Sequence, residues 1–206
     1  TPLIVIPETI TIGGESTDPN KAYASPLTTL IAELMQPDFA AGQNKLETTL
    51  GFSTDVDLLY YDPLKAITLG DSNGLPIFAQ QAKLQNLVFQ TIQIISDASS
   101  INNAEIGQVV IDLVIDSNDL DLNNPQEVEE NLQEVEGFIE DAIVNLQPQE
   151  SFNLSPALIR LTAENIIENN ESIDRIASDS NLTLNDAAVE IGTHILPAEI
   201  TLDIPQ

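Results

Sequence analysis

The sequence predicts a mainly α-helical bundle of about seven helices with a short β-strand at each terminus, which is α+β by strict count. Two observations predict the helices: apolar residues recur at helical spacing through the middle of the chain, and Ser-Pro, Asp-Pro and Asn-Pro pairs mark helix starts. A third predicts the strands, because β-branched residues alternate with other residues at both ends. We therefore expect residues 1–206 to form a single domain, with a subdivision into 13–100 and 101–206 as the alternative.

Both termini have the pattern of a strand. Residues 1–12 are rich in β-branched side chains, and Pro2 and Pro7 confine such a strand to a sheet edge or to irregular pairing. Residues 198–204 alternate cleanly and place three apolar side chains on one face, those of Ile200, Leu202 and Ile204. The two strands either pair within one chain, as a small sheet that covers the bundle, or the 1–12 strand pairs with a neighbouring copy.

The first half of the helical region is expected to contain helices at 25–35, 39–50, 62–70 and 76–97. Ser25-Pro26 and Asp62-Pro63 each supply a capping side chain followed by a proline at the first helical position. The long helix at 76–97 carries one apolar stripe, formed by Leu84, Leu87, Val88, Thr91, Ile94 and Ile95.

The second half is expected to begin with a helix after Asn103, followed by helices at 125–146, 156–176 and 186–195. In the 125–146 helix, Asn124 is the predicted N-cap and Glu127 completes a capping box. Its apolar residues follow a 4-3-4-3-4 spacing that suits packing on neighbouring helices, at Val128, Leu132, Val135, Ile139, Ala142 and Leu146. Asn185 is the predicted cap of the last helix.

The charge balance excludes two classes of partner. The chain has 33 acidic and 6 basic residues, a formal charge of −27, yet charged residues make up only 19% of it, below the usual value of about 25%. The imbalance therefore reflects missing lysine and arginine. Without them the protein cannot neutralise the phosphates of a nucleic acid or bind an anionic membrane surface, and no apolar run is long enough to insert into a bilayer.

The gap in basic residues also indicates a habitat. No lysine or arginine lies between Lys83 and Arg160, and residues 105–141 contain twelve acids. Such a segment repels itself unless salt or bound cations screen it. A salty or calcium-rich exterior supplies that screening, so we expect a secreted protein at the cell surface.

The search for a catalytic site finds little. His194 is the only histidine, and there is no cysteine, so a cysteine–histidine pair is impossible. Paired carboxylates for glycoside hydrolysis are available, but aromatic residues make up only 4% of the chain and there is no tryptophan to bind a sugar. We therefore expect that the protein is not an enzyme.

Calcium is the one cofactor that the sequence suggests. Residues 119–130 place oxygen donors at positions 1, 3, 5, 9 and 12 of an EF-hand-like register, and the metal ligands we single out are Asp119, Asp121, Asn123 and Glu130. The sixth position is Asn124 where an EF-hand has glycine. In the alternative interpretation, Asn124 simply begins a helix and the acids lie near its positive end. Residues 71–74 form a second candidate, for which a plain turn is the alternative.

A resemblance covers about a third of the chain, between residues 22 and 95. It rests on Ser25-Pro26-Leu27-Thr28-Thr29-Leu30, Leu50-Gly51-Phe52, Asp57-Leu58-Leu59-Tyr60-Tyr61-Asp62-Pro63 and the glutamine-rich segment 80–88. Together these resemble a helical module of large exported bacterial and cyanobacterial surface adhesins, with its "SPLTTL", "LGL" and "DLLTYDP" segments. The resemblance implies export and a structural or adhesive role, and it brings no catalytic residue.

These observations lead to three hypotheses about function. The first is an extracellular structural or adhesive protein, either a surface module or a filament subunit, that self-associates by pairing of its terminal strands. The second is a calcium-responsive binding module of a secreted bacterial protein, in which metal orders the loop before the 125–146 helix. The third, ranked behind these two, is a hydrolase that uses paired carboxylates.

Overall fold

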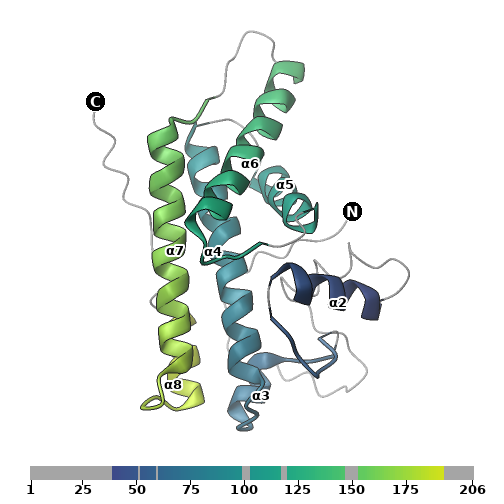
Figure 1. Cartoon of the computed structure of the whole chain (residues 1–206), viewed down its shortest axis with the longest axis vertical. Helices are drawn as coiled ribbons and strands as arrows, with labels where there is room; N and C mark the ends of the chain where they lie inside the picture. Colours follow the sequence, from purple (N-terminus) through teal and green to yellow (C-terminus); the bar gives the residue numbers. More distant parts are fainter. Residues whose placement is uncertain are drawn as a thin grey trace.

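The computed structural model describes residues 39–50, 52–58, 60–98, 103–116, 120–146 and 153–192. Seven helices account for most of these residues (Figure 1): α2 (Phe39–Thr49), α3 (Pro63–Thr68), α4 (Gly74–Ala98), α5 (Asn103–Asp116), α6 (Pro125–Leu146), α7 (Pro156–Ser178) and α8 (Leu184–Glu190). The prediction of a mainly helical fold is confirmed. This part of the chain contains no strand, and the strands predicted at 1–12 and 198–204 lie outside the described residues, as does the helix predicted at 25–35.

The two longest helices, α4 and α7, pack against each other and form the axis of the bundle (Figure 1). They are antiparallel, because Lys83 is bonded to Asp174 while Asn86, further along α4, is bonded to Asn170, further back along α7. Helix α6 packs on α7, and α5 packs on both α4 and α6. Helices α3 and α8 lie together at one end of this axis, and α2 lies beside α5.

In the described part of the chain, the predicted helix starts agree with the structure to within two residues, and one predicted cap is wrong. The carboxylate of Asp62 caps α3 by accepting the N–H of Lys65 at 3.0 Å, and Ser155 caps α7 in the same way. The cap of α8 is Thr183, however, and not Asn185. The hydroxyl of Thr183 accepts the N–H of Asp186 and donates to its carboxylate at 2.7 Å, a reciprocal pair that fixes the first turn two residues earlier than expected.

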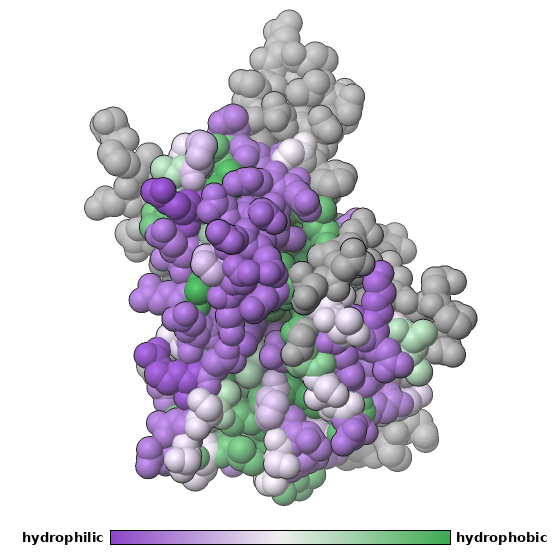
Figure 2. Space-filling model, viewed as in Figure 1, coloured by the Kyte–Doolittle hydropathy of each residue, from purple (hydrophilic) through white to green (hydrophobic). Residues whose placement is uncertain are grey.

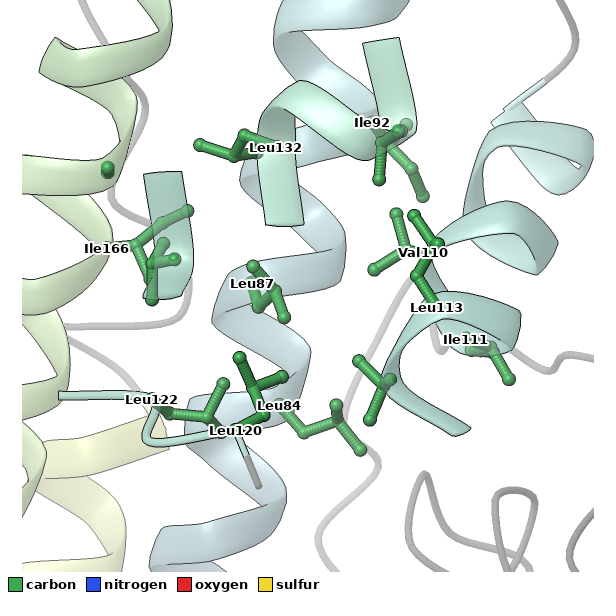
Figure 3. Close-up of a cluster of buried hydrophobic side chains, with 14 of the residues drawn as sticks. Leu84, Leu87, Ile92, Val110, Ile111, Leu113, Leu120, Leu122, Leu132 and Ile166 are labelled. Atoms are coloured by element: carbon green, nitrogen blue, oxygen red, sulfur yellow. The ribbon is translucent and has the colours of Figure 1, made fainter. Parts of the chain in front are cut away.

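Two clusters of buried apolar side chains hold the helices together. The larger joins α2, α4, α5, α6 and α7, and Figure 3 shows Leu84 and Leu87 of α4 close to Leu120 and Leu122. The smaller joins α3, α4, α7 and α8, and includes Ile67. Both combine residues from before and after residue 100, and each fully buried leucine or isoleucine contributes about 1.5–3 kcal/mol by leaving water.

Helix α2 is also tied to the segment that follows it by one side chain. The Nε2 atom of Gln43 donates to the carbonyl of Val56 at 2.9 Å, and its Oε1 atom accepts the N–H of Leu58 at 3.1 Å. The amide thus bonds to this segment as a neighbouring strand would, and Leu58, only 2% exposed, is held in the larger cluster. None of the helices of the described part is both long and apolar enough to cross a membrane.

The junction between α3 and α4 requires a glycine. A Cβ atom at Gly74 would lie 2.9 Å from the backbone nitrogen of Ile67 and 2.9 Å from the carbonyl oxygen of Pro63. Both are backbone atoms of α3, so they cannot move aside as a flexible side chain could. Gly137 of α6 is the opposite case, since a Cβ atom there meets nothing within 4 Å.

We therefore predict opposite effects for the same substitution at these two glycines. Gly74→Ala should lower the free energy of unfolding by about 2 kcal/mol or more, because α3 has to separate from α4. Gly137→Ala should raise it by roughly 0.5–1 kcal/mol, because alanine loses less backbone entropy in a helix. Urea denaturation of both variants measures the difference, and equal effects would contradict the close packing of α3 on α4.

Candidate functional site

The turn at residues 120–124, which leads into α6, is held in the bundle at several points. The side chains of Leu120 and Leu122 are buried in the larger apolar cluster. The N–H of Leu120 donates to the carbonyl of Thr49, at the end of α2, at 2.7 Å. A buried turn must find partners for its own backbone groups, and here they come from helices that are distant in sequence.

Glu127, in the first turn of α6, stabilises the start of its own helix. Its two carboxylate oxygens accept the backbone N–H of Asp121 and the side-chain amide of Asn124, each at 2.6 Å. The predicted capping role of Glu127 therefore extends past the cap residue to the turn before it. The Oδ1 atom of Asp121 accepts the N–H of Asn123 at 2.9 Å, so both acids are used in shaping this turn.

A chain of buried side-chain amides ends on the same turn. Gln90 Nε2 donates to Asn86 Oδ1 at 2.5 Å, and Asn86 Nδ2 donates to Asn170 Oδ1 at 2.9 Å. Asn170 Nδ2 then donates to the carbonyl of Leu122 at 2.6 Å. All three amides are at most 4% exposed. Because an amide both donates and accepts, this chain links α4, α7 and the turn without a net charge, and each bond polarises the next.

One ion pair lies beside the amide chain. The ammonium group of Lys83 is 2.6 Å from each carboxylate oxygen of Asp174, and Asn123 Nδ2 donates to the same carboxylate at 2.7 Å. The Lys83 side chain is 6% exposed, whereas that of Asp174 is 43% exposed. A buried ammonium needs such a partner, and the pair anchors the turn to α4 and α7 through Asn123.

Lys83, Asn123 and other residues of this region line an open pocket of about 350 Å³. Its lining comes from the end of α2, from α4, from the turn and from the first turn of α6: Leu50, Gln80, Lys83, Asp121, Leu122, Asn123 and Glu127. The lining is mostly polar, and its ammonium is already neutralised by Asp174. The two acids that line the pocket, Asp121 and Glu127, already accept hydrogen bonds within the turn.

Of the three predicted calcium ligands that the structure describes, two line this pocket. Asp119 lies outside the described residues. Asp121 and Asn123 lie in the turn and line the pocket, whereas Glu130 is exposed on α6 and is not among its lining residues. The additional acid at the pocket is Glu127. Among the described residues, no group of three or more acids or histidines is placed to hold a metal ion, and calcium binding stays a prediction.

The position of Glu130 has a simple cause. In an EF-hand-like register the loop extends over most of its twelve positions before the exiting helix begins. Here α6 already begins at Pro125, the seventh position, because Asn124 and proline start a helix there. Glu130 therefore lies in the second turn of α6, while Glu127 lies in the first and faces the preceding turn.

The second candidate, residues 71–74, has the contacts of a plain turn. Asp71 Oδ1 accepts the N–H of Asn73 at 2.9 Å, and Asp71 Oδ2 accepts the phenol of Tyr61 at 3.0 Å. Burial raises the pKa of the Tyr61 phenol well above its usual range, and the hydrogen bond to the Asp71 carboxylate and the charge of that carboxylate raise it further.

Sequence reasoning did not single out the residues that form the polar centre: Lys83, Asn86, Gln90, Asn170 and Asp174. A signal was present, because the first three recur at spacings of three and four within the apolar α4, and the last two follow the same spacing within α7. Polar residues at positions that face a core predict mutual hydrogen bonds. The pattern does not reveal which helix supplies the partner.

Comparison of the chain with protein-family models, with curated proteins and with solved structures finds no match.

The amide chain yields a prediction about stability. Asn170→Ala removes the donor to Leu122 and one of the two acceptors of Asn86 Nδ2, which also donates to the carbonyl of Ile166. Each buried hydrogen-bonding group left without a partner costs about 1–3 kcal/mol. We expect a loss of about 2–4 kcal/mol in the free energy of unfolding, measured by urea denaturation. Asn169→Ala is the matched control, because Asn169 is half-buried and makes one long bond of 3.4 Å to Asn86. An Asn170→Ala loss no larger than that of the control would contradict the role of the chain.

The pair of Tyr61 and Asp71 yields a prediction about pH. Since the pKa of Tyr61 is raised above its unfolded value of 10.0, folding favours the neutral phenol. That contribution is complete below pH 10 and is lost as the pH rises above it, because the unfolded chain then releases the proton more readily. Tyr61→Phe should therefore flatten the decline of stability above pH 10 in urea titrations. An unchanged slope would contradict this assignment.

Proposed function

We propose that this chain is a structural or adhesive protein of the bacterial cell exterior, a surface module or filament subunit that self-associates by pairing of its terminal strands. The resemblance of residues 22–95 to exported surface adhesins motivates the proposal. Its strongest support from the described residues is the way in which polar side chains inside the fold connect helices to one another.

The polar centre illustrates this use. Lys83, Asn86 and Asn170 are almost completely buried, and each is bonded to a neighbouring helix or to the turn at 120–124. A protein that bears mechanical load or presents a surface needs helices that keep a fixed register, and buried hydrogen bonds provide it, since slipping by one residue would leave several polar groups without partners.

The outer surface supports an external setting. Figure 2 shows a hydrophilic face along the part of the molecule where α6 and α7 lie. Five exposed acids on these two helices contribute to their outer faces: Glu130, Glu134, Glu164, Glu168 and Glu171. Arg160 compensates only Glu164, at 3.8 Å. Such a surface repels itself at low ionic strength and is screened in salty or calcium-rich surroundings.

Calcium responsiveness is the second candidate, and the observation that favours it is the pocket beside the turn. Asp121 and Asn123, two of the predicted ligands, line it together with Glu127. Calcium there would have to compete with the N–H groups that these acids already accept. The hydrolase alternative has no comparable observation in its favour and stays a prediction.

Electron microscopy of the purified chain, with calcium and with a chelator, tests the proposed assembly. We expect filaments or higher oligomers from the full chain and none after deletion of residues 1–12, because the strand that joins one copy to the next is then missing. A synthetic peptide of residues 1–12 should bind the shortened chain and is the add-back control.

The outcomes separate the proposals. A shortened chain that is folded and still assembles contradicts the pairing of terminal strands, as does a full chain that remains monomeric under both conditions. Assembly that depends on calcium and not on residues 1–12 favours the calcium-responsive module instead.

A further inference from the structure

Helix α8 packs on both central helices, α4 and α7, at one end of the bundle (Figure 1). Its residues Ala187 and Ile191 are buried in the smaller apolar cluster. The same cluster contains Ala82 of α4 and Ile173 of α7. These contacts identify the face of each central helix that α8 covers. Because α4 and α7 are much longer than α8, that face continues beyond it.

On α4, this face leads from Ala82 to Phe89. The two residues are seven positions apart, which is about two turns of a helix, so they lie on the same side. Ala82 is fully buried, whereas Phe89 is 43% exposed. Between Ile77 and Ser96, Phe89 is the only exposed residue of α4. Beyond α8, an aromatic side chain is therefore left partly uncovered on a helix that is otherwise enclosed.

On α7, the same face leads from Ile173 back to Asn169 and Asn165, in steps of four residues. Asn169 Nδ2 donates to Asn86 Oδ1 of α4 at 3.4 Å, so the two helices meet at this level. Phe89 lies one turn beyond Asn86. Because the helices are antiparallel, Asn165 lies one turn beyond Asn169 in the same direction. We call the surface that these residues form the α4–α7 face.

Amide side chains surround the aromatic ring on the α4–α7 face. Gln85 and Gln93 lie four residues before and after Phe89, and Asn165 and Asn169 lie on α7. None of these side chains is charged, in a chain with a net charge of −27. Gln93 Oε1 is buried, yet it accepts no hydrogen bond from the part of the chain that the structure describes. Since a buried acceptor requires a donor, the face can bind a further N–H group.

An amide elsewhere in this protein already binds an extended segment. Gln43 donates to the carbonyl of Val56 and accepts the N–H of Leu58, so one side chain contacts the backbone as a neighbouring strand would. Such main-chain bonds hold an extended segment, while every second side chain points into the surface beneath it. A segment with alternating apolar residues therefore suits the α4–α7 face.

The chain supplies such a segment beside this face. Residues 198–204 are the predicted strand with three apolar side chains on one side. The short connection at 179–183 turns α8 back along α7, so the chain leaves α8 in the direction of Asn169. Residues 193–206 can extend over about 45 Å, whereas Ile173 and Asn165 are only about 12 Å apart along α7.

We propose that the α4–α7 face binds residues 198–204 of the same chain as an extended segment. The apolar side of this segment covers Phe89, and one of its backbone N–H groups donates to Gln93 Oε1. Its alternate residues, which include Glu199 and Asp203, point to solvent. The segment thereby occupies a surface that an extended segment of another chain could otherwise bind. This inference concerns a single chain and does not depend on the proposed self-association, so either can fail without the other.

Disulfide cross-linking tests the proposal directly, because the full chain contains no cysteine of its own. Gln85→Cys is combined in turn with a cysteine substitution at each of residues 200–204. The fastest cross-link within one chain should come from an even-numbered position and form about tenfold faster than from either odd-numbered position, because successive side chains of a strand point to opposite sides. Gln133→Cys, at an exposed position of α6, is the matched control for Gln85→Cys and should show no such preference.

Thiol labelling of single-cysteine variants keeps the test independent of disulfide geometry. Leu202→Cys should react with a maleimide about tenfold more slowly than Thr201→Cys, because the face covers it. Adding Phe89→Ser should remove this protection, whereas Leu69→Ser, at an exposed leucine at the end of α3, should leave it unchanged. Equal rates at odd and even positions, cross-links that form only between two chains, or protection that survives Phe89→Ser would each overturn the proposal.

Discussion

Hydrogen bonds from buried side-chain amides connect the turn at 120–124 to the two central helices of this bundle, α4 and α7. The turn at 120–124 passes between helices with its leucines in the core, so its backbone must be satisfied from within. Asn170 supplies the donor to Leu122, and Asn123 ties the turn to Asp174. Because these partners belong to α7, and the amide chain continues to α4, the position of the turn sets the register of the two central helices.

The use of amide side chains to connect the helices is consistent with the shortage of basic residues in the chain. A chain with six basic residues has few ion pairs to place inside, and only Lys83 is used in that way among the described residues. Asparagine and glutamine carry a donor and an acceptor on one side chain, so a row of them can extend from helix to helix without leaving a charge to neutralise. The apolar clusters then supply most of the stability, while the amides select one arrangement of the helices.

The parts of this fold that could be predicted are those that local sequence controls. Asp62, Ser155 and the proline after each mark helix starts because a cap acts within one turn. The cap of α8 was misplaced because Thr183 and Asn185 are both good caps, and the reciprocal bond of Thr183 with Asp186 decides between them. Glu130 of the predicted calcium register lies on α6 and is not among the residues that line the pocket, because Pro125 already begins a helix where that register assumes a loop. The polar centre was not predictable, because the pairing of Asn86 with Asn170 depends on how α4 and α7 pack.

The interior and the surface of this protein should respond differently to their surroundings. The amide chain carries no net charge, and the apolar clusters are indifferent to moderate salt, so the fold itself depends little on ionic strength. The acids on α6 and α7 have few cations near them, so the repulsion between two copies depends strongly on ionic strength. Added salt would then weaken the repulsion between copies without altering the packing of the helices. The charge of −27 thus acts mainly between molecules, and the lack of net charge in the core is the reason why the fold tolerates it.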